Sequence, residues 1–540
     1  MRAVSFRWPG RDWKGDPIPS NPFAPPVHVP IPPELVSKAA LLAHWGMNER
    51  ELKKIRWYRR KMYHVFELEK SGGKRRRILA PDKRLKHLQR RILPLLNQLY
   101  RVRNPVHGFV SGKSVKTNAA AHLRRRNILN VDVQDFFGTI TENRVVGVLE
   151  AIGVSHDVAS TIGVVCCCEG ALPQGAPTSP VLSNMICFRL DRELMHFAKS
   201  ARCIYTRYAD DITFSSHQPI TAAFESAIPP SGNFKLELLS SQLLEIFTAN
   251  GFTLNPSKVH YADRNSRRTV TGLKVNELLN VDRRFVRNLR AKLHSFEKLG
   301  PIDAQQRFID LGNSGSLAQH IRGKIEWLVN VKGAYDPVVR SIIARHNICL
   351  PSQAIPIEPT MEERRERAIW VTESDNEQGS VFFLKDVGLV TAAHCLDGQG
   401  HIEIFHPANH ANTFAATVAH VDNARDLAIL SHDIPVTEYF ELDLGVRAPA
   451  VGDKVNALGY PSWGFGDPLN IRPGVVSTLT KKADVRLIEV TQKLAQGMSG
   501  GPVTNESGEV VGIIHKGGPQ EGRDFAIDAR ELQQLANVCQ

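Results

Sequence analysis

The sequence predicts a multidomain protein in which an α+β body is followed by an all-β body. Charge divides the chain: residues 1–360 carry 53 basic and 30 acidic side chains, a net of +23, whereas residues 361–540 carry 15 and 25, a net of −10. Helical and strand patterns mix without a βαβ rhythm up to about residue 345. Beyond a linker, short strands alternate with Gly, Asp, Asn and Pro, which is typical of a barrel or a sandwich. A chain of 540 residues predicts three or four domains.

The first body opens with an extended arm and a small hairpin. Residues 17–33 hold eight prolines, which favours an extended segment over a core element. Helical periodicity starts near Leu35. A strand is then predicted at 63–66, and a turn over Ser71–Gly73 leads into a second strand at Ile78.

A long amphipathic helix is predicted over Asp282–Leu299. One face is apolar, and the basic residues fall mostly elsewhere. The apolar residues are Phe285, Leu289, Leu293 and Phe296, and the basic ones are Arg283, Arg284, Arg287, Arg290 and Lys292. The apolar stripe predicts core packing, and the arginines suit contacts with the phosphates of a duplex. Residues 350–366, with three prolines and a charge cluster, predict a linker.

Composition also limits the compartment and the partners. No run of eighteen apolar residues is present, so we expect no membrane-spanning helix, and the N-terminus lacks the apolar core of a secretion signal. The eight cysteines are scattered without a CxxC pair, which indicates a reducing, cytoplasmic environment. The positive charge of the first body favours a polyanionic partner, although charge alone does not separate DNA, RNA and an anionic membrane.

Two acidic motifs interrupt apolar runs in the first body. Asp132 follows the apolar run 128–131, and the pair Asp210 and Asp211 lies between two further apolar runs. Adjacent carboxylates in an apolar hairpin repel each other and are poorly solvated. Mg²⁺ removes that cost, and two such ions about 3.5–4 Å apart can promote in-line nucleotidyl transfer. The alternative is a solvated Asp-Asp turn, which the apolar flanks disfavour.

Seven motifs in this body resemble, in order, those of reverse transcriptases, and within that family those of the retron group. They are KRRRILAP (Lys74–Pro81), NAAAH (Asn118–His122), VDVQDFF with Asp132, LPQGAPTSPVLSN (Leu172–Asn184), YADD with Asp210 and Asp211, GFTLNPSKV (Gly251–Val259) and VTG (Val270–Gly272). NAAAH and VTG point to retrons. The resemblance implies a right-hand polymerase of fingers, palm and thumb, with the thumb at about 280–345.

The resemblance also implies a metal site. Asp132, Asp210 and Asp211 would ligate two Mg²⁺ ions, with Mn²⁺ as the alternative metal. The Val133 carbonyl would add one oxygen. Lys258 would either protonate the leaving pyrophosphate or be a solvated charge.

The same resemblance implies a nucleotide pocket. Arg76, with Lys74 nearby, would hold the triphosphate of the incoming dNTP, or would be a surface arginine. Phe137 would lie under the sugar and exclude a 2′-OH. Gln174 and Gly175 would line the nucleotide and the template strand.

Retron enzymes use a structured noncoding RNA as template and, through an internal guanosine 2′-OH, as primer. The resemblance therefore implies this RNA and its branched cDNA product as partners. The candidate RNA-binding residues are Asn118, His122, Val270, Thr271, Gly272, Arg283, Arg287 and Arg290. For His122, simple packing on a helix is an equally good interpretation.

Three motifs in the second body follow the order His, Asp, Ser: VTAAHC with His394, ARDLAIL with Asp426 and GMSGGPV with Ser499. A serine becomes nucleophilic when a histidine takes its proton, and an aspartate orients that histidine. The set resembles the trypsin-like (chymotrypsin-fold) serine proteases over residues 367–540, which implies an all-β double barrel. The backbone N–H groups of Gly497 and Ser499 would form the oxyanion hole.

Two residues depart from the secreted members of that family. Cys395 follows the histidine, but this body has no upstream cysteine to pair with it, in agreement with a cytoplasmic protein. Met498 stands where the family often has Asp, so activation by a new N-terminus that pairs with this acid cannot occur.

The predicted domains are an N-terminal extension (1–35), a reverse transcriptase (36–345), a linker (346–366) and a serine protease (367–540). We expect a retron reverse transcriptase fused to a protease effector that cleaves an unknown protein in anti-phage defence. Two alternatives stay open. One assigns the first body to a group II intron or a diversity-generating element, and the other makes the protease-like body only a binding module.

Overall fold

The computed structural model describes residues 30–540 except 70–74, 375–376, 516–522, 533–534 and 536–540. Most of the predicted N-terminal extension, the turn over Ser71–Gly73 and Lys74 therefore lie outside the described residues. The chain divides into two compact units, Met1–Ile355 and Pro356–Gln540. This is fewer than the three or four domains predicted from length.

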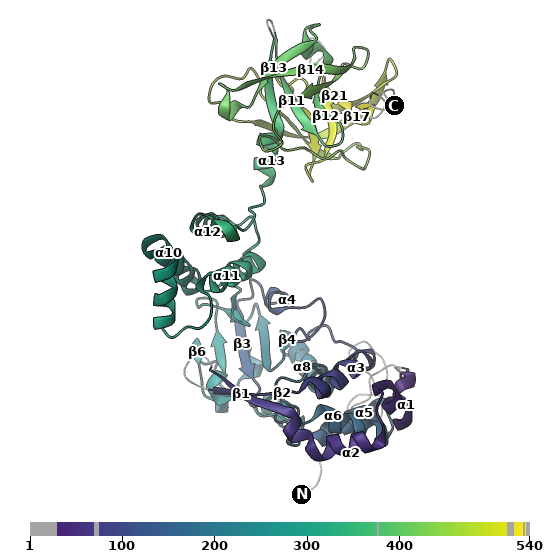
Figure 1. The fold of residues 1–540 in the computed structure, drawn as a ribbon, viewed down its shortest axis with the longest axis vertical. Coiled ribbons are helices and arrows are strands. Elements are labelled where there is room, and N and C mark those ends of the chain that lie inside the picture. The colour runs from purple at the N-terminus through teal and green to yellow at the C-terminus, as the bar shows by residue number, and fades with distance from the viewer. Residues whose placement is uncertain (1–29, 70–74, 375–376, 516–522, 533–534, 536–540) are drawn as a thin grey trace. The chain divides into compact units, whose positions relative to one another are not determined.

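A five-stranded antiparallel sheet organises the first unit (Figure 1). Its strand order is β4 (Ile204–Tyr208), β5 (Asp211–Ser216), β3 (Asn127–Asp132), β7 (His260–Ala262) and β6 (Gly232–Asn233). The successive residues Ile128 and Leu129 of the middle strand are both fully buried, so both faces of the sheet are covered there. A separate hairpin pairs β1 (Tyr63–Glu69) with β2 (Arg75–Pro81), which confirms the two predicted strands.

The helices before residue 250 supply most of the remaining core of this unit. They are α1 (Lys38–Trp45), α2 (Glu49–Tyr58), α3 (Lys83–Leu99), α4 (Val115–Ala120), α5 (Glu142–Ile152), α6 (His156–Cys166), α7 (Ser179–Ile186), α8 (Phe188–Ser200) and α9 (Ser241–Ala249). Local sequence sets several of their starts. Asn48 and Glu51 form a capping box on α2, and the Asp82 carboxylate accepts the Leu85 N–H at the start of α3.

The predicted amphipathic helix begins as expected and then continues past its predicted end. α10 (Arg283–Asp310) is capped by Asp282, and Leu289, Leu293 and Phe296 are buried as predicted. The helix kinks at Gly300, where φ is 75°. It packs with α11 (Leu317–Lys332) and α12 (Pro337–Cys349), and a short hairpin of β8 (Thr269–Val270) and β9 (Leu273–Lys274) precedes it.

The segment predicted as a linker, 346–366, contains helix at both ends. α12 continues to Cys349, and α13 (Met361–Ala368) starts with a capping box between Thr360 and Glu363. The charged run MEERRE is therefore a helical turn that leads into the second unit, because its threonine and glutamate satisfy the first amides of a helix.

The second unit consists of two closed six-stranded barrels, which confirms the predicted double barrel. The first contains β10 (Ile369–Glu373), β11 (Gln378–Leu384), β12 (Gly388–Thr391), β15 (Leu427–His432), β14 (Thr413–Asp422) and β13 (His401–Phe405). The second contains β16 (Lys454–Gly459), β17 (Asn470–Lys482), β18 (Val485–Val490), β21 (Asp524–Asp528), β20 (Val510–Ile514) and β19 (Pro502–Asn505).

The two barrels form one unit because they share a hydrophobic core. Val371 and Val390 of the first barrel belong to the same buried cluster as Leu458 and Ile513 of the second. Across the described residues of both units, no helix is long and apolar enough to cross a membrane.

Candidate active sites

The three predicted catalytic aspartates meet at one end of β3 and β5. Asp132 is the last residue of β3, and its cross-strand partner is Asp211, the first residue of β5. Asp210 lies in the turn between β4 and β5, where its carbonyl accepts the Val133 N–H at 3.0 Å. Ala209, which precedes the pair, has a φ of 57°, a left-handed geometry held by the tight strand connection.

Repulsion dominates the electrostatics of this cluster. Partial burial and the charges of Asp210 and Asp132 raise the pKa of Asp211 to about 7, and burial and Asp132 also raise the pKa of Asp210. Because Asp211 stays exposed to solvent, we attribute more of its shift to the neighbouring carboxylates than to desolvation. Lys258 Nζ lies 2.6 Å from Asp132 Oδ2, so this lysine pairs with the cluster and is not merely a solvated charge.

This donor set fits hard divalent ions such as Mg²⁺. A cation relieves the repulsion among the carboxylates, and a small number of protein oxygens leaves positions for phosphate oxygens. The Val133 carbonyl accepts no backbone hydrogen bond from any described residue, so it is available as a ligand. Within the described chain, the three aspartates do not bring one oxygen each within 4.8 Å of one another.

A buried ion pair that the sequence did not suggest supports the acidic turn. Arg207 and Asp191 are both fully buried and form two hydrogen bonds, at 2.7 and 2.8 Å. Arg207 also donates to the Asn184 side chain at 3.0 Å and to the Ala209 carbonyl at 3.3 Å. The guanidinium thus ties α7 and α8 to the backbone just before Asp210.

The residues predicted to hold a nucleotide lie on β2 and on the loops beside it. Arg76 is half-buried on β2, and its positive charge acts on Asp210, which places it toward the acidic cluster. The Gln174 carbonyl accepts a β2 amide at 2.9 Å. Gly175 has a φ of 130°, and a Cβ there would lie 2.9 Å from a β2 side chain, so the loop packs closely on the hairpin. Phe137 is half-buried, and its ring packs against that of Phe136 with the centroids 5.3 Å apart.

The predicted protease residues come from both barrels of the second unit. His394 lies just after β12 and Asp426 just before β15, in the first barrel, whereas Ser499 precedes β19 in the second. His394 Nδ1 is 2.8 Å from Asp426 Oδ2, and the His394 backbone N–H donates to Oδ1 at 2.9 Å. No hydrogen bond joins Ser499 Oγ to His394 among the described residues.

The His394–Asp426 pair is strongly polarised. Burial alone would lower the pKa of His394, but the hydrogen bonds and negative charges of Asp426 and Cys395 together outweigh it and raise that pKa to about 10. Burial opposes ionisation of Asp426 as well, yet its hydrogen bonds hold its pKa well below the usual range. The carboxylate is therefore ionised, and His394 Nδ1 carries the shared proton.

The loop before Ser499 contains the two amides that the sequence predicts for the oxyanion hole. Gly497 has a φ of 88°, and a Cβ there would lie 2.5 Å from the Ser462 nitrogen. Ser462 N–H donates to the Gln496 carbonyl at 3.0 Å, which turns the Gly497 N–H of that peptide to the opposite side. The buried Ser380 hydroxyl donates to the Gly497 carbonyl at 2.8 Å. Within the described residues, neither the Gly497 nor the Ser499 N–H donates to a carbonyl.

Comparisons with known proteins assign the first unit. A family model described as reverse transcriptase (RNA-dependent DNA polymerase) matches residues 68–275. The retron Mx65 reverse transcriptase of Myxococcus xanthus is 37% identical over 266 residues, which cover 46% of this chain and 59% of that protein. The retron Ec86 reverse transcriptase of Escherichia coli is 32% identical over 273 residues, which cover 50% of this chain and 76% of that protein. This chain belongs to the retron reverse transcriptase family.

The same comparisons assign the second unit of this retron reverse transcriptase. A trypsin-like peptidase domain model matches residues 379–513. Mouse serine protease HTRA4 is 32% identical over 173 residues, which cover 30% of this chain and 34% of that protein. The chain therefore carries a reverse transcriptase domain followed by a trypsin-like peptidase domain.

The two retron motifs lie side by side, but most of their side chains are buried. The Thr271 hydroxyl donates to the Val115 carbonyl of α4 at 3.3 Å, which joins the VTG turn to the NAAAH helix. His122 is fully buried, its ring nitrogens lie 2.6 and 2.7 Å from the hydroxyls of Ser215 and Thr206, and burial lowers its pKa to about 3. The hypothesis that His122 contacts RNA is wrong for this structure, because the ring is enclosed between α4 and the sheet.

The other RNA-binding candidates include both buried and exposed residues. Asn118 and Val270 are each 1% exposed, so direct RNA contact is also contradicted for these two side chains. Gly272 lies exposed in the VTG turn with a φ of 81°. The candidates on α10, Arg283, Arg287 and Arg290, are all exposed to solvent.

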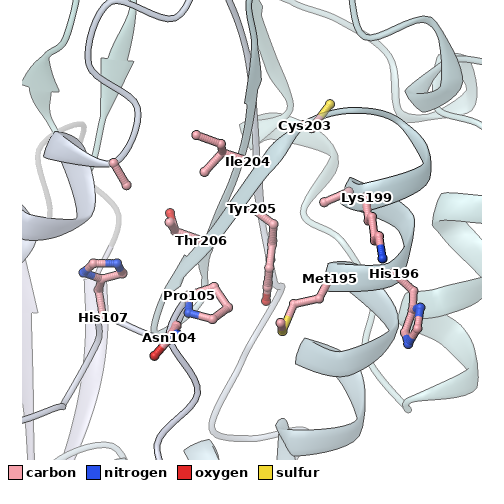
Figure 2. A pocket seen from close by; sticks show the side chains of 12 residues that line it. Asn104, Pro105, His107, Met195, His196, Lys199, Cys203, Ile204, Tyr205 and Thr206 are labelled. Carbon is pink, nitrogen blue, oxygen red and sulfur yellow. The ribbon is translucent and has the colours of Figure 1, made fainter. Parts of the chain in front are cut away.

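A cavity of about 450 Å³ borders the edge strand β4 (Figure 2). Its lining includes Thr206 of β4, His107 from the loop before α4, and Met195 and Lys199 of α8. None of the predicted catalytic or nucleotide-binding residues lines this cavity, so it is separate from the acidic site.

Proposed function

We propose that this protein is an RNA-directed DNA polymerase that copies a structured noncoding RNA into a single-stranded cDNA joined to that RNA. The observation that carries the proposal is the meeting of Asp132, Asp210 and Asp211 at the end of β3 and β5, in a domain of the retron family. The substrates of this reaction would be the dNTP and the noncoding RNA.

The residues of the chain divide the work of a two-metal nucleotidyl transfer. Asp132, Asp210, Asp211 and the Val133 carbonyl would hold two Mg²⁺ ions, or Mn²⁺. When bound, these ions supply positive charge at the attacking and leaving oxygens. Lys258 would neutralise part of the acidic cluster, since it already pairs with Asp132.

The loops next to the acidic site would position the nucleotide. Arg76 would bind the triphosphate, and Phe137 would contact the sugar and select against a 2′-OH. Gln174 and Gly175 would place the base against the template, because their loop is packed on β2. Positioning and electrostatics of this kind are sufficient for phosphoryl transfer.

The test is to express the full chain with its noncoding RNA and to extract the nucleic acid. Wild type should yield a short single-stranded DNA joined to RNA, and Asp210→Ala with Asp211→Ala should yield none. Asp303→Ala, which removes an exposed carboxylate of α10, is the matched control and should match wild type. Linear cDNA without an RNA branch would favour a group II intron or diversity-generating type of enzyme instead.

We propose further that the second unit is an active serine endopeptidase acting on a protein substrate. The pre-formed oxyanion loop and the His394–Asp426 pair support this role. A fluorophosphonate probe should label wild type at Ser499 and should not label Ser499→Ala. Ser507→Ala, at an exposed serine nearby, should label like wild type. A wild-type protein that does not react would indicate a binding module with an unused triad.

The fusion itself suggests that the two activities are coupled in anti-phage defence within the cytoplasm. Covalent linkage keeps the peptidase at high local concentration near the polymerase–RNA–DNA complex. The seven described cysteines are unpaired, which suits a reducing compartment. We expect the intact complex to restrain the peptidase and nuclease treatment to release it. Equal cleavage of a general protease substrate before and after nuclease treatment would refute this coupling.

A further inference from the structure

The aspartate of the peptidase site binds a second histidine that neither the sequence motifs nor the triad includes. His515 Nδ1 lies 2.6 Å from Asp426 Oδ2, the same oxygen that His394 Nδ1 approaches at 2.8 Å. The two rings stand nearly perpendicular, with centroids 6.3 Å apart. Because Asp426 is ionised and can only accept, His515 Nδ1 must carry a hydrogen and donate it.

Asp426 is held from every side by donors. Its carboxylate accepts the His394 backbone N–H at 2.9 Å in addition to the two imidazoles, and its own carbonyl accepts the Ala393 N–H at 3.2 Å. Its φ of 56° is left-handed, which is unfavourable for a non-glycine residue and persists only where surrounding contacts fix it. The His515 contact is one of those that fix it.

His515 also connects the two barrels at the catalytic groups. It directly follows β20, whose last residue, Ile514, exchanges hydrogen bonds with Gly500 and Gly501 next to the nucleophile, at 2.9 and 2.8 Å. Asp426 and His394 belong to the first barrel. A rigid connection therefore leads from the Ser499 loop through β20 and His515 to the carboxylate that orients the base.

We propose that His515 is a positioning residue of the peptidase site, which holds Asp426 in the orientation that His394 requires and shares that carboxylate with it. This inference rests on the proposed peptidase function. It assigns to His515 no contact with substrate.

Sharing the carboxylate has a consequence for pH dependence. Among the described groups, Asp426 and Cys395, the residue after His394, shift the pKa of His394 most strongly. The pKa of Asp426 is shifted most strongly by His394 and His515. The hydrogen bond from His515 draws negative charge from Asp426 Oδ2, the oxygen that His394 Nδ1 also approaches. If the donor is removed, Asp426 serves His394 alone and still accepts its backbone N–H. The pKa of His394 should then rise, and the base should be free only at higher pH.

The test compares His515→Leu, which removes the donor, with His515→Asn, whose amide can still donate to Asp426. We expect His515→Leu to lower kcat toward a small ester substrate about tenfold with little change in KM. The acid limb of its pH–rate profile should move up by about half to one pH unit. His515→Asn should restore both values to near those of wild type, and His401→Leu, at an exposed histidine of β13, should leave them unchanged.

A second readout separates this inference from the proposed function. Selective ¹³C labelling of histidines allows the titration of His394 to be followed by NMR in the full chain carrying Ser499→Ala, where no turnover is needed. His515→Leu should raise the pKa of His394 in that background, even if the wild type fails to react with a fluorophosphonate. If His515→Leu lowers the rate but moves neither the acid limb of the pH–rate profile nor the pKa of His394, His515 only packs against the site and the proposal is wrong. An unchanged rate together with an unchanged pKa of His394 would also overturn it.

Discussion

The polymerase and peptidase units use aspartate in opposite ways. At the polymerase site, three carboxylates are close enough to repel, and the described cation in contact with them is Lys258. The pKa of Asp211 is raised in consequence. At the peptidase site, a single carboxylate, Asp426, accepts three donors, and its pKa is held well below the usual range.

This contrast indicates what each site lacks. The polymerase site has an excess of negative charge, so we expect it to depend on cations from solution. The peptidase site has its charge balanced by the protein, so it is complete without them. Treatment with a chelator should therefore stop DNA synthesis and leave fluorophosphonate labelling of Ser499 unchanged.

The largest effect is expected from Asp426→Asn. The amide keeps the shape of the side chain but loses the charge and favours the wrong imidazole tautomer, so we expect the rate of fluorophosphonate labelling to fall about 10⁴-fold. Asp433→Asn, at an exposed carboxylate of the same unit, is the control and should label normally. Labelling of Asp426→Asn within tenfold of wild type would contradict the assigned role of this aspartate.

The complementary change is Asp132→Asn in the polymerase unit. It removes one of the three metal-ligand candidates and the partner of Lys258, so primer extension on an RNA template should fall about 10³-fold or more. Fluorophosphonate labelling should stay at the wild-type rate. If Asp132→Asn still extends the primer, the assigned role of Asp132 is wrong. If Asp132→Asn lowers fluorophosphonate labelling, the two sites are not independent.

The residues on which these two predictions depend could be predicted from the sequence because each belongs to a short motif. Asp132 belongs to VDVQDFF and Asp426 to ARDLAIL, and in each case the residues beside the aspartate identify it. The all-β character of the second unit was likewise predictable, since its strands are short and bounded by turn residues. The strand pattern left a barrel and a sandwich open, and the double barrel followed only from the resemblance to trypsin-like proteases.

The residues that support these groups could not be predicted, because their partners are distant in the sequence. Asp426 and His515 are 89 positions apart, and nothing near either residue signals their contact. His122 shows the same limit. The sequence left RNA contact and packing on a helix equally open, and hydroxyls 84 and 93 positions away, on β4 and β5, enclose the ring. Only the three-dimensional fold shows such pairs.

Arg207 was missed for the same reason, and it gives the third prediction. Arg207→Met would leave the Asp191 charge buried without its partner, so we expect a loss of about 3–5 kcal/mol in the free energy of unfolding of the first unit. Adding Asp191→Leu should recover a substantial part of it, since no buried charge then remains. Urea unfolding followed by circular dichroism measures both, and equal stability of the single and double variants would show that the pair is not coupled.

The smallest expected effect is the pH dependence of metal stabilisation at the polymerase site, which tests the charge excess directly. Without metal, folded Asp211 keeps its proton up to about pH 7, whereas an unfolded aspartate releases it near pH 3.9. Between these values the folded state binds more protons than the unfolded state, so its stability falls as pH rises. Mg²⁺ favours the ionised carboxylates and should therefore raise Tm more at pH 8 than at pH 5.5.

Thermal unfolding of the full chain in Mg²⁺ or chelator at the two pH values measures this difference. Asp211→Asn should weaken the pH dependence in chelator, because the titrating group is gone and one of the repelling charges goes with it. Asp303→Asn, at an exposed aspartate, should behave like wild type. If Mg²⁺ instead stabilised the protein equally at both pH values, the carboxylates would already be ionised and compensated at pH 5.5. The polymerase site would then resemble the peptidase site, and the contrast between the two units would not hold.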